Sequence, residues 1–561
     1  MNQIFLWLET VRHTRGSQLL SRARLSCKRK VATSPIGALL RTLTANGAKG
    51  TPNTNPGILS PIFPPQGGRV VKCKDSYLIT FLNETREFKH PFDWHPPELE
   101  SGTRLWKLNL HYLEFIENLD NESFMAVVED WIDNNPPYRR EYWLDYWNSY
   151  AISIRCAVMM QQYALRNSLL PTGFKEKILR SIFDQIVYLE SNLELDILGN
   201  HLIKNIKALL LASRFFSHKL CNRWNNLALK LLHRELGEQI LEDGFHYERS
   251  LSYHCQVFCD LLDISVALGN NDRLLQEKLF PMAQVIADMT HPDGFVSLFN
   301  DAGFHAAYSP FVCLDTYRRI TGHSPIQRRL FRFKDAGYSG LRSEDSVFIA
   351  DCGPIGPDFL MAHAHGDILS FEWSIQNKRV IVDAGVFEYN PGFWRDYSRK
   401  TSSHNTVTID DGDQCQFWSS FRVGRRAKVQ CLEYQITEFG FVLRGTHDGY
   451  SGLKGKPIHR RDFCISPAKI EIRDEIKNGD GQSVCSRLLL HPECEVCVVN
   501  DHNARISIGS VLIILTTRAR ISCVEGWWSP DWGIRQNSKF LVLHYGDCPL
   551  SIEYRLELIQ R

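Results

Sequence analysis

The spacing of apolar residues changes near residue 340, and this change constrains the fold more than any other feature of the sequence. From about 104 to 335, apolar residues recur at i, i+3 and i+4, which is typical of amphipathic helices. Beyond about 340 the period becomes two, which is typical of strands with one buried face. A helical half followed by a β half predicts two large domains.

The helical half contains segments of clear helical spacing joined by short turns, such as Gly269-Asn270-Asn271. Successive helices with short connections pack as antiparallel hairpins. The predicted helices span residues 105–119, 150–165, 175–195, 202–216, 224–241, 250–268 and 274–289.

The β half reads as strands separated by tight turns, such as Asp410-Asp411-Gly412-Asp413. This pattern predicts a sandwich of antiparallel strands. The predicted strands include residues 346–350, 368–375, 379–383, 405–409, 441–445, 469–473, 511–516 and 540–545.

The charge of the chain is nearly balanced, with 65 basic and 63 acidic residues and a net charge of +2. This gives no argument for binding nucleic acid or a membrane surface. Residues 1–50 are the exception, because they hold nine Lys or Arg against Glu9 alone. This basic segment runs into a Gly/Pro-rich stretch, residues 46–68, that predicts a linker.

Targeting signals are weak in this sequence. No apolar run reaches the roughly 18 residues of a transmembrane helix, and the run at residues 4–8 is shorter than a signal-peptide core. Sixteen scattered cysteines favour a reducing compartment, so we expect the cytoplasm rather than the periplasm. Export by another route stays open.

A cluster of polar residues in the β half has the composition of a metal site. His363 and His365 are two apart, so on a strand they share one face. Asp383 and His404 follow at intervals that allow His365, Asp383 and His404 to come from separate strands of one sheet. These are ligand types that Zn²⁺ takes. By residue type alone, ordinary core or surface histidines explain the pattern better than a metal site does.

Two further groups of polar residues lie in the helical half. Asn200 and His201 follow Gly199 at a predicted helix start, where an Asn is also a common N-cap. Tyr253 and His254 open a later helix, where a Tyr is usually a packing residue. Neither group is decisive when taken alone.

Taken together, in order and spacing, these motifs resemble the heparinase II/III-like polysaccharide lyases. The resemblance extends over nearly the whole chain and includes the basic opening, residues 11–25. The matching stretches are GNHLIKNIKALLLA (199–212), EDGFHYERSLSYH (242–254), FNDAG (299–303), HAHGDILSFEWS (363–374), VDAGVFEYN (382–390), SSHNTVTID (402–410) and QFWSSFRVGRRAKV (416–429).

The resemblance implies an N-terminal incomplete (α/α) toroid followed by a C-terminal antiparallel β-sandwich. We place a basic segment and linker at 1–74, the toroid at 75–335 and the sandwich at 336–561. The implied activity is β-elimination on a uronic-acid polysaccharide. The C5 proton is removed and the C4–O bond breaks, which leaves a C4=C5 unsaturated uronate end. The implied partner is an acidic polysaccharide.

The resemblance also implies a role for each matching residue. Asn200 would neutralise the substrate carboxylate, with His201 beside it. Tyr253 would donate a proton to O4 or serve as both base and acid, and His363 would be the second acid/base group. Arg249 is a candidate positive neighbour for Tyr253, one helical turn earlier. Tyr389 is a further active-site candidate, with Tyr397 competing for that place. His365, Asp383 and His404 would bind a Zn²⁺ that organises the structure or the site.

One position departs from the family pattern. Gly366 stands where the HAHAD-type motif has Ala, and we expect a small backbone consequence. A uronate C5-epimerase shares the carbanion step and stays open, as does a non-catalytic polysaccharide-assembly protein. A glycoside hydrolase ranks last, because it would need two opposed carboxylates. The polymer, the mode of cleavage and the oligomeric state also stay open.

Overall fold

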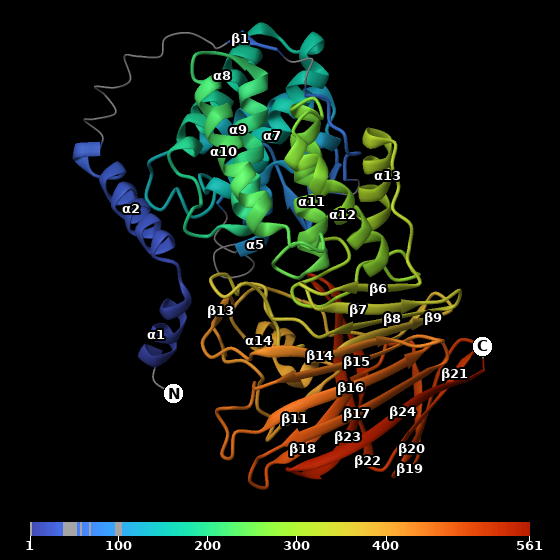
Figure 1. Cartoon of the computed structure of the whole chain (residues 1–561). Coiled ribbons are helices and arrows are strands. Elements are labelled where there is room, and N and C mark those ends of the chain that lie inside the picture. Colours follow the sequence, from blue (N-terminus) through green and yellow to red (C-terminus); the bar gives the residue numbers. More distant parts are fainter. Residues whose placement is uncertain (1–2, 38–52, 56–58, 67–68, 96–103, 561) are drawn as a thin grey trace. The chain divides into compact units, whose positions relative to one another are not determined.

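A computed structural model describes residues 3–37, 53–55, 59–66, 69–95 and 104–560 (Figure 1). Much of the predicted linker, residues 46–68, lies outside these ranges. The chain divides into two compact units. One contains Thr14–Gly237 and Cys259–Leu279, and the other contains Met1–His13, Glu238–Phe258 and Phe280–Arg561. We call them the helical unit and the β unit.

Helix α7 (Ser149–Arg166) lies at the centre of the helical unit, because it packs on α8 (Thr172–Glu190) and α9 (Gly199–Phe215) and is buried along most of its length. Its start is fixed by Asn148, whose side chain accepts hydrogen bonds from two backbone amides. The other elements are α2 (Gly16–Ala32), α5 (Arg104–Tyr112), η3 (Glu114–Asn118), α6 (Asn121–Asn134), η4 (Asn167–Leu169), α10 (Cys221–Gln239), β1 (Asn53–Thr54), β2 (Val70–Lys72), β3 (Tyr77–Phe81), β4 (Glu84–Phe88) and β5 (Phe216–Ser217).

Most of the helices predicted between about 104 and 335 are present, and two helices in that range were missed. The single helix predicted at 105–119 is interrupted. Leu113 has a left-handed backbone conformation (φ 59°) that ends α5 and separates it from η3. The missed helices are α6 and α13 (Pro310–Thr321). Both begin at a capping side chain, Asp120 and Ser309 respectively, so the sequence did carry a local signal for each.

Three antiparallel sheets form most of the β unit. The order of the five-stranded sheet is β10 (Lys378–Ile381), β9 (Phe371–Ile375), β8 (Ser346–Asp351), β7 (Tyr338–Arg342), β6 (Leu330–Phe333). The order of the eight-stranded sheet is β14 (Val429–Ile436), β15 (Phe441–His447), β16 (Ile458–Ser466), β17 (Lys469–Lys477), β24 (Leu550–Gln560), β21 (Val511–Thr517), β20 (Asn503–Ile508), β19 (Glu495–Asn500). The order of the four-stranded sheet is β11 (Val407–Ile409), β18 (Ser483–Leu489), β23 (Ile534–Asp547), β22 (Arg520–Asp531).

The sheets bury one shared core, to which Phe348, Trp373, Phe463, Ile513 and Leu541 belong. Strands β16 and β17 alternate between buried and more exposed residues, as expected of a sheet with one covered face. Strands β8 and β9 are buried along their whole length.

Further helical elements, among them α13, and a short hairpin complete the β unit. Helix α1 (Gln3–His13) lies against the hairpin of β12 (Phe417–Trp418) and β13 (Arg422–Val423), with Trp418 donating a hydrogen bond to Thr10. The short helix α14 (Phe393–Arg399) and the turn η5 (Thr401–Ser403) precede β11.

The boundary that we placed at 335/336 does not separate the two units. It falls between β6 and β7, which are hydrogen-bonded neighbours in one sheet. The β unit also takes in the start of α11 (Leu251–Ala267) and the end of α12 (Arg273–Met289). Tyr253 therefore belongs to the same unit as His363, although it lies in the predicted helical domain.

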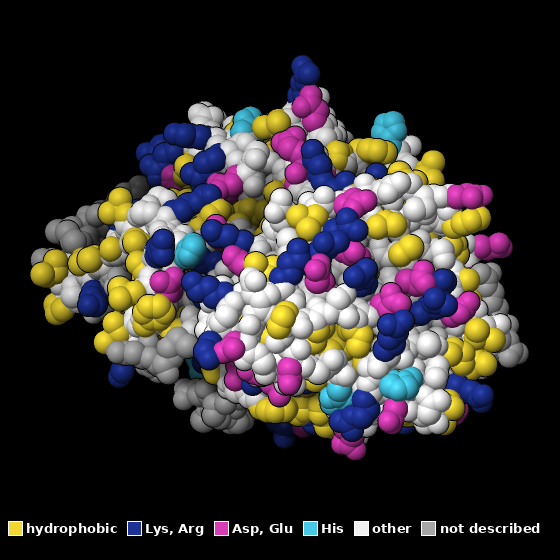
Figure 2. Space-filling view, turned by 60° about the horizontal axis from the view of Figure 1, so that its bottom comes forward, with side chains coloured by type: hydrophobic (Ala, Val, Ile, Leu, Met, Phe, Trp, Pro, Cys, Tyr) yellow, Lys and Arg dark blue, Asp and Glu magenta, His cyan; other side chains and the backbone are white. Residues whose placement is uncertain are grey.

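Among the described residues, no helix is both long and apolar enough to span a membrane. Basic and acidic side chains are interspersed on the face seen in Figure 2, in keeping with the small net charge.

Candidate active site and metal centre

Tyr253, in the first turn of α11, meets two side chains of the β unit. Its ring stacks on the imidazole of His363, with ring centroids 3.9 Å apart and an interplanar angle of 27°. Its hydroxyl lies 2.8 Å from the hydroxyl of Tyr389. The three polar groups converge although they come from three separate segments of the chain.

Two carboxylates flank the imidazole of His363. Its Nδ1 lies 2.8 Å from Oδ2 of Asp301, and its Nε2 lies 3.8 Å from Oε2 of Glu248. When Nδ1 carries the proton that Asp301 accepts, Nε2 keeps its lone pair. The side chain of His363 is 12% exposed. The arrangement suits a general base.

Asp301 is completely buried and contacts both His363 and His365. Its two carboxylate oxygens receive hydrogen bonds from His363, His365 and Arg395. Burial alone would raise the pKa of Asp301, but Arg395 and the two histidines hold it well below its usual range. The Ser250 hydroxyl also donates to the Asp301 carbonyl at 2.6 Å.

Burial raises the pKa of Tyr253 well above its usual value, and the charges of Asp301 and Glu248 add to this effect. The hydrogen bond from Tyr389 and the charge of Arg395 act in the opposite direction. Tyr253 is therefore protonated at neutral pH, which suits a proton donor better than a base.

The positive neighbour predicted for Tyr253 was wrong. The guanidinium of Arg249 donates hydrogen bonds to the backbone carbonyls of Tyr247, Asp335 and Ala336, so it connects two backbone segments of the β unit. Arg395, from α14, is the cation whose charge acts on Tyr253. Arg395 is far from Tyr253 in the sequence, and the residues next to it did not indicate this role.

The competition between the two candidate tyrosines is decided by their hydroxyl contacts. The hydroxyl of Tyr389 is hydrogen-bonded to that of Tyr253, and the Cζ atom of Arg395 lies 4.8 Å from the centroid of the Tyr389 ring. The hydroxyl of Tyr397 exchanges hydrogen bonds with the backbone of Trp527. Tyr389 is thus the one that belongs to the site.

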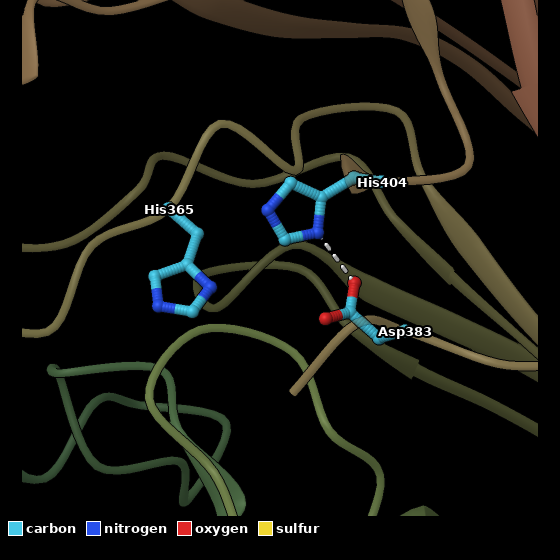
Figure 3. Close-up of side chains that lie close together, drawn as sticks. All are labelled: His365, Asp383 and His404. Carbon is cyan, nitrogen blue, oxygen red and sulfur yellow. Dashed lines mark hydrogen bonds and ion pairs between the residues drawn. The ribbon is translucent and has the colours of Figure 1, made fainter. Parts of the chain in front are cut away.

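His365, Asp383 and His404 converge in the buried interior of the β unit (Figure 3). One potential ligand atom from each lies within 4.8 Å of the others. Nδ1 of His404 is 2.8 Å from Oδ2 of Asp383. Within the described part of the chain, no other group of three such residues meets this criterion.

The donor atoms of this cluster fit a divalent metal. Nδ1 of His365 and Nε2 of His404 are buried and have no hydrogen-bond partner among the described residues. Burial lowers the pKa of His365 to about 3, so its imidazole is neutral, as a metal ligand must be. Its other nitrogen, Nε2, lies 2.8 Å from Asp301, the outer carboxylate contact common in zinc sites.

A nearby carboxylate points to the same conclusion. Burial and the charge of Asp383 raise the pKa of Asp367 to about 6, and Oδ1 of Asp367 has no partner among the described residues. His404 lies beside both carboxylates, and their charges outweigh its burial and raise its pKa, so its imidazolium balances them when no metal is bound and a divalent metal would take over that role.

The backbone around these ligands differs from the prediction. His363 and His365 lie in a loop before β9, so they do not share a strand face, and the three ligands do not come from strands of one sheet. Asp383 follows β10 and His404 follows η5. The glycine at position 366 also matters more than we expected. A Cβ atom there would lie 2.4 Å from the Thr401 hydroxyl oxygen, so the surroundings would have to shift to accept an alanine.

Asn200 and His201 belong to the helical unit and are described within it. Helix α9 begins at Gly199, as predicted, and Asn200 is buried in its first turn. Nδ1 of His201 lies 3.0 Å from Oε1 of Glu194, and its ring contacts Tyr150 at 4.3 Å.

Sequence reasoning missed Asp301, Arg395 and Glu248 as members of the site. Asp301 lies within the FNDAG stretch that supports the resemblance, so its position was marked although its role was not. Glu248 lies within the matching stretch 242–254 in the same way, whereas Arg395 gave no signal beyond its charge.

Two family models match the chain, the heparinase II/III N-terminus over residues 107–318 and the heparinase II/III-like C-terminal region over residues 325–553. The chain belongs to the heparinase II/III-like family. It is 24% identical to a heparin-sulfate lyase of Bacteroides stercoris over 316 residues, which cover 51% of this chain and 45% of the relative.

Two other curated relatives have similar identity. A heparin-sulfate lyase of Pedobacter heparinus is 25% identical over 275 residues, covering 43% of this chain and 40% of that protein. FtsZ-localized protein C of Caulobacter vibrioides is 25% identical over 333 residues, covering 54% and 53%. The chain thus spans less than half the length of the two lyases.

Solved structures of heparinases share the fold. The crystal structure of heparinase III superposes with a TM-score of 0.68 at 19% identity, covering 84% of this chain and 79% of that one. A mutant heparan sulfate lyase from Pedobacter heparinus gives 0.62 at 17% identity, covering 85% and 80%. The predicted fold class, an incomplete (α/α) toroid followed by an antiparallel β-sandwich, is confirmed.

Proposed function

We propose that the protein is a polysaccharide lyase that cleaves a uronate-containing acidic polysaccharide by β-elimination. The observation that carries the proposal is the stacking of Tyr253 on His363, with Asp301 hydrogen-bonded to the imidazole and Tyr389 to the phenol. Relatives named as heparin-sulfate lyases support the same class of reaction.

In the proposed reaction His363 is the base and Tyr253 is the acid. Nε2 of His363 takes the C5 proton, and the electrons of that C–H bond form the C4=C5 double bond. The C4–O4 bond breaks, and O4 receives the Tyr253 proton to become a free hydroxyl. The raised pKa of Tyr253 favours this division of roles over a tyrosinate base. The roles that the resemblance implies for Asn200 and His201 form part of the proposal.

We also propose that His365, Asp383 and His404 hold a Zn²⁺ ion. When bound, the ion would supply a fixed positive charge that cross-links three loops of the β unit. The chain's own residues would perform the elimination, because His363 and Tyr253 lie outside the ligand set. Asp301 orients His363 and, through Nε2, His365.

The test is a screen of heparan sulfate, alginate and hyaluronan for far-ultraviolet absorbance from a new C4=C5 bond, with chain length measured in parallel. Absorbance together with chain shortening is the expected result. Proton exchange at C5 without shortening would instead identify an epimerase. Binding of a polymer with neither change would identify a non-catalytic protein.

A further inference from the structure

An aromatic cluster beside the proposed active site surrounds a single arginine. The Cζ atom of Arg535, in β23, lies 3.9 Å from the ring centroid of Trp394, 4.9 Å from that of Trp527 and 5.1 Å from that of Phe387. We call these four residues the Arg535 platform. The proposed elimination does not use any of them.

The Arg535 platform reaches the surface with a charge that no acidic group offsets. Arg535 is exposed and its three aromatic partners are half-buried. Among the described residues, no carboxylate pairs with its guanidinium and no group accepts a hydrogen bond from it. The neighbouring Phe393 is 66% exposed and contacts Trp394 with ring centroids 4.8 Å apart. Exposed clusters of large apolar side chains commonly mark binding sites.

The platform is continuous with the site around Tyr253. Between β22 and β23, Trp532 packs its ring 5.4 Å from that of Tyr389, which is bonded to Tyr253. The next residue, Gly533, donates its backbone amide to the carbonyl of Phe387.

The α14 helix provides a second connection. Trp394 belongs to the platform, whereas the next residue, Arg395, is buried and pairs with Asp301. The segments that carry Tyr389 and Arg395, which contact the proposed acid and the carboxylate of Asp301, therefore also carry the platform residues Phe387 and Trp394.

The chemistry of the platform fits an acidic sugar. Aromatic rings pack against the apolar C–H face of a pyranose ring, while their edges leave its hydroxyls free. Stacking on Trp394 occupies a face of the Arg535 guanidinium and leaves its in-plane N–H groups available. Those groups match a carboxylate or sulfate in a two-pronged hydrogen bond. The cation–π contacts also restrict the side chain before any ligand arrives, which lowers the entropy lost on binding.

We propose that the Arg535 platform is a subsite that binds one acidic sugar residue of the substrate next to the bond that is cleaved. Arg535 pairs with the carboxylate or sulfate, and Trp394 and Trp527 pack against the sugar ring. This inference rests on the proposed function, because it assigns a second contact to the same polysaccharide.

The test measures binding directly, so that it does not depend on turnover. Oligosaccharides of heparan sulfate, alginate and hyaluronan are titrated calorimetrically into the full-length Tyr253→Phe protein, and then into Tyr253→Phe/Arg535→Gln. We expect the Kd of the bound oligosaccharide to rise about tenfold, as expected for one lost charge-assisted hydrogen bond. The salt dependence of binding should weaken as well, because one ion pair is gone.

Two further variants separate the chemistry from general effects. Arg535→Lys keeps the charge but loses the planar fork, so it should recover only part of the affinity. Arg505→Gln, at an exposed arginine of β20, removes the same charge from the eight-stranded sheet and should leave the Kd unchanged. In the otherwise wild-type protein, Arg535→Gln should raise KM and leave kcat within about twofold.

An oligosaccharide that binds Tyr253→Phe equally well with and without Arg535 would overturn the subsite and leave the lyase proposal intact. If none of the three polymers is bound or cleaved by the wild-type protein, both proposals fail. Because Arg535 is exposed, we expect its variants to melt at the wild-type temperature, so a change in Kd reports binding and not folding.

Discussion

In the proposed reaction Tyr253 is the acid and His363 is the base, and this division of roles would make each of the two stacked rings individually necessary. Tyr253→Phe removes one hydroxyl and keeps the ring that packs on His363. General acid–base groups typically contribute about 10²–10⁴-fold, so kcat should fall by about that factor while substrate affinity changes little. His363→Ala should cost a comparable amount.

The matched control for Tyr253→Phe is Tyr397→Phe. Tyr397 is also a partly buried tyrosine of the β unit, but its hydroxyl bonds the backbone of Trp527. Its variant should therefore keep kcat near the wild-type level, and any effect through Trp527, a residue of the Arg535 platform, should change KM instead. Initial rates on the polymer identified by absorbance measure both. Near wild-type turnover by Tyr253→Phe would show that this tyrosine only packs.

Asp301 has two separable roles, and its substitution should affect two different measurements. Asp301→Asn keeps the shape of the side chain but removes the charge that both histidines and Arg395 contact. Loss of an outer-shell carboxylate typically weakens metal binding about 10–100-fold, so Zn²⁺ affinity measured against a chelator should fall in that range. Excess Zn²⁺ should restore metal content but not kcat, because His363 stays misoriented.

Two additional variants make the Asp301 result interpretable. Ser250→Ala removes a contact to the Asp301 carbonyl and leaves its carboxylate untouched, so affinity and kcat should both be close to wild type. Asp301→Asn leaves Arg395 as a buried charge without its carboxylate. If this single variant does not fold, the double variant Asp301→Asn/Arg395→Gln removes the unpaired charge as well. Full recovery of kcat on adding Zn²⁺ would reduce Asp301 to a metal-site residue.

At the scale of elements, the sequence predicted what local patterns encode and missed what tertiary packing decides. Helical periodicity located α7 through α12 because each buries a face that repeats along the sequence. It did not show that α11 is shared by two compact units, because that division depends on contacts far along the chain. Likewise, the period-two pattern indicated strands but not that β6 begins before the expected boundary.

The candidate site shows the same contrast. The grouping of His365, Asp383 and His404 was predicted from the family resemblance, because their residue types alone do not distinguish metal ligands from ordinary histidines. The loops that carry them were not predicted, because a buried arginine fixes their backbone. Arg461, in β16, donates to the carbonyls of Leu369 and Asn405, close in sequence to two of the ligands, and pairs with Asp474 in β17. Nothing in the local sequence around Arg461 distinguishes it from a surface charge.

The turn η3 carries a carboxyl group that should make stability depend on pH. Burial and the charge of Glu114 raise the pKa of Glu117 to about 7. Because this folded-state pKa lies above that of the unfolded chain, near 4.5, the folded state holds the extra proton between these values. The free energy of unfolding contributed by this group therefore falls as pH rises from about 4.5 to 7.

Glu117→Gln should abolish this dependence. Relative to wild type, its free energy of unfolding should increase between pH 5 and pH 8 by at most about 3 kcal/mol. Urea denaturation at both pH values measures the difference, with Glu176→Gln on the exposed face of α8 as the control for losing one carboxylate. A wild-type-minus-variant difference that is the same at both pH values would contradict the assignment.

At the scale of the whole molecule, the proposed metal would connect parts of the β unit that the sheets alone leave separate. The ligands follow three different elements, and each ligand is completely buried. A metal that binds only the folded state raises stability by about 4 kcal/mol when its concentration is a thousand times Kd. When the metal is removed, His404 can pair with Asp383 as an imidazolium, which offsets part of this loss.

We therefore expect the purified protein to contain one Zn²⁺ and its melting temperature to fall by several degrees on chelation. His404→Ala should lack the metal, melt at a lower temperature than wild type and show no further response to chelator. Cys497→Ser is the matched control, because Cys494 and Cys497 form the chain's CxxC, the other plausible source of bound zinc. This variant should keep both the metal and the response to chelation. Elemental analysis measures the zinc content, and thermal melting measures the stability, of the wild type, His404→Ala and Cys497→Ser. Bound zinc that disappears in Cys497→Ser and persists in His404→Ala would move the metal to the cysteines and leave the histidine cluster as a hydrogen-bonded core.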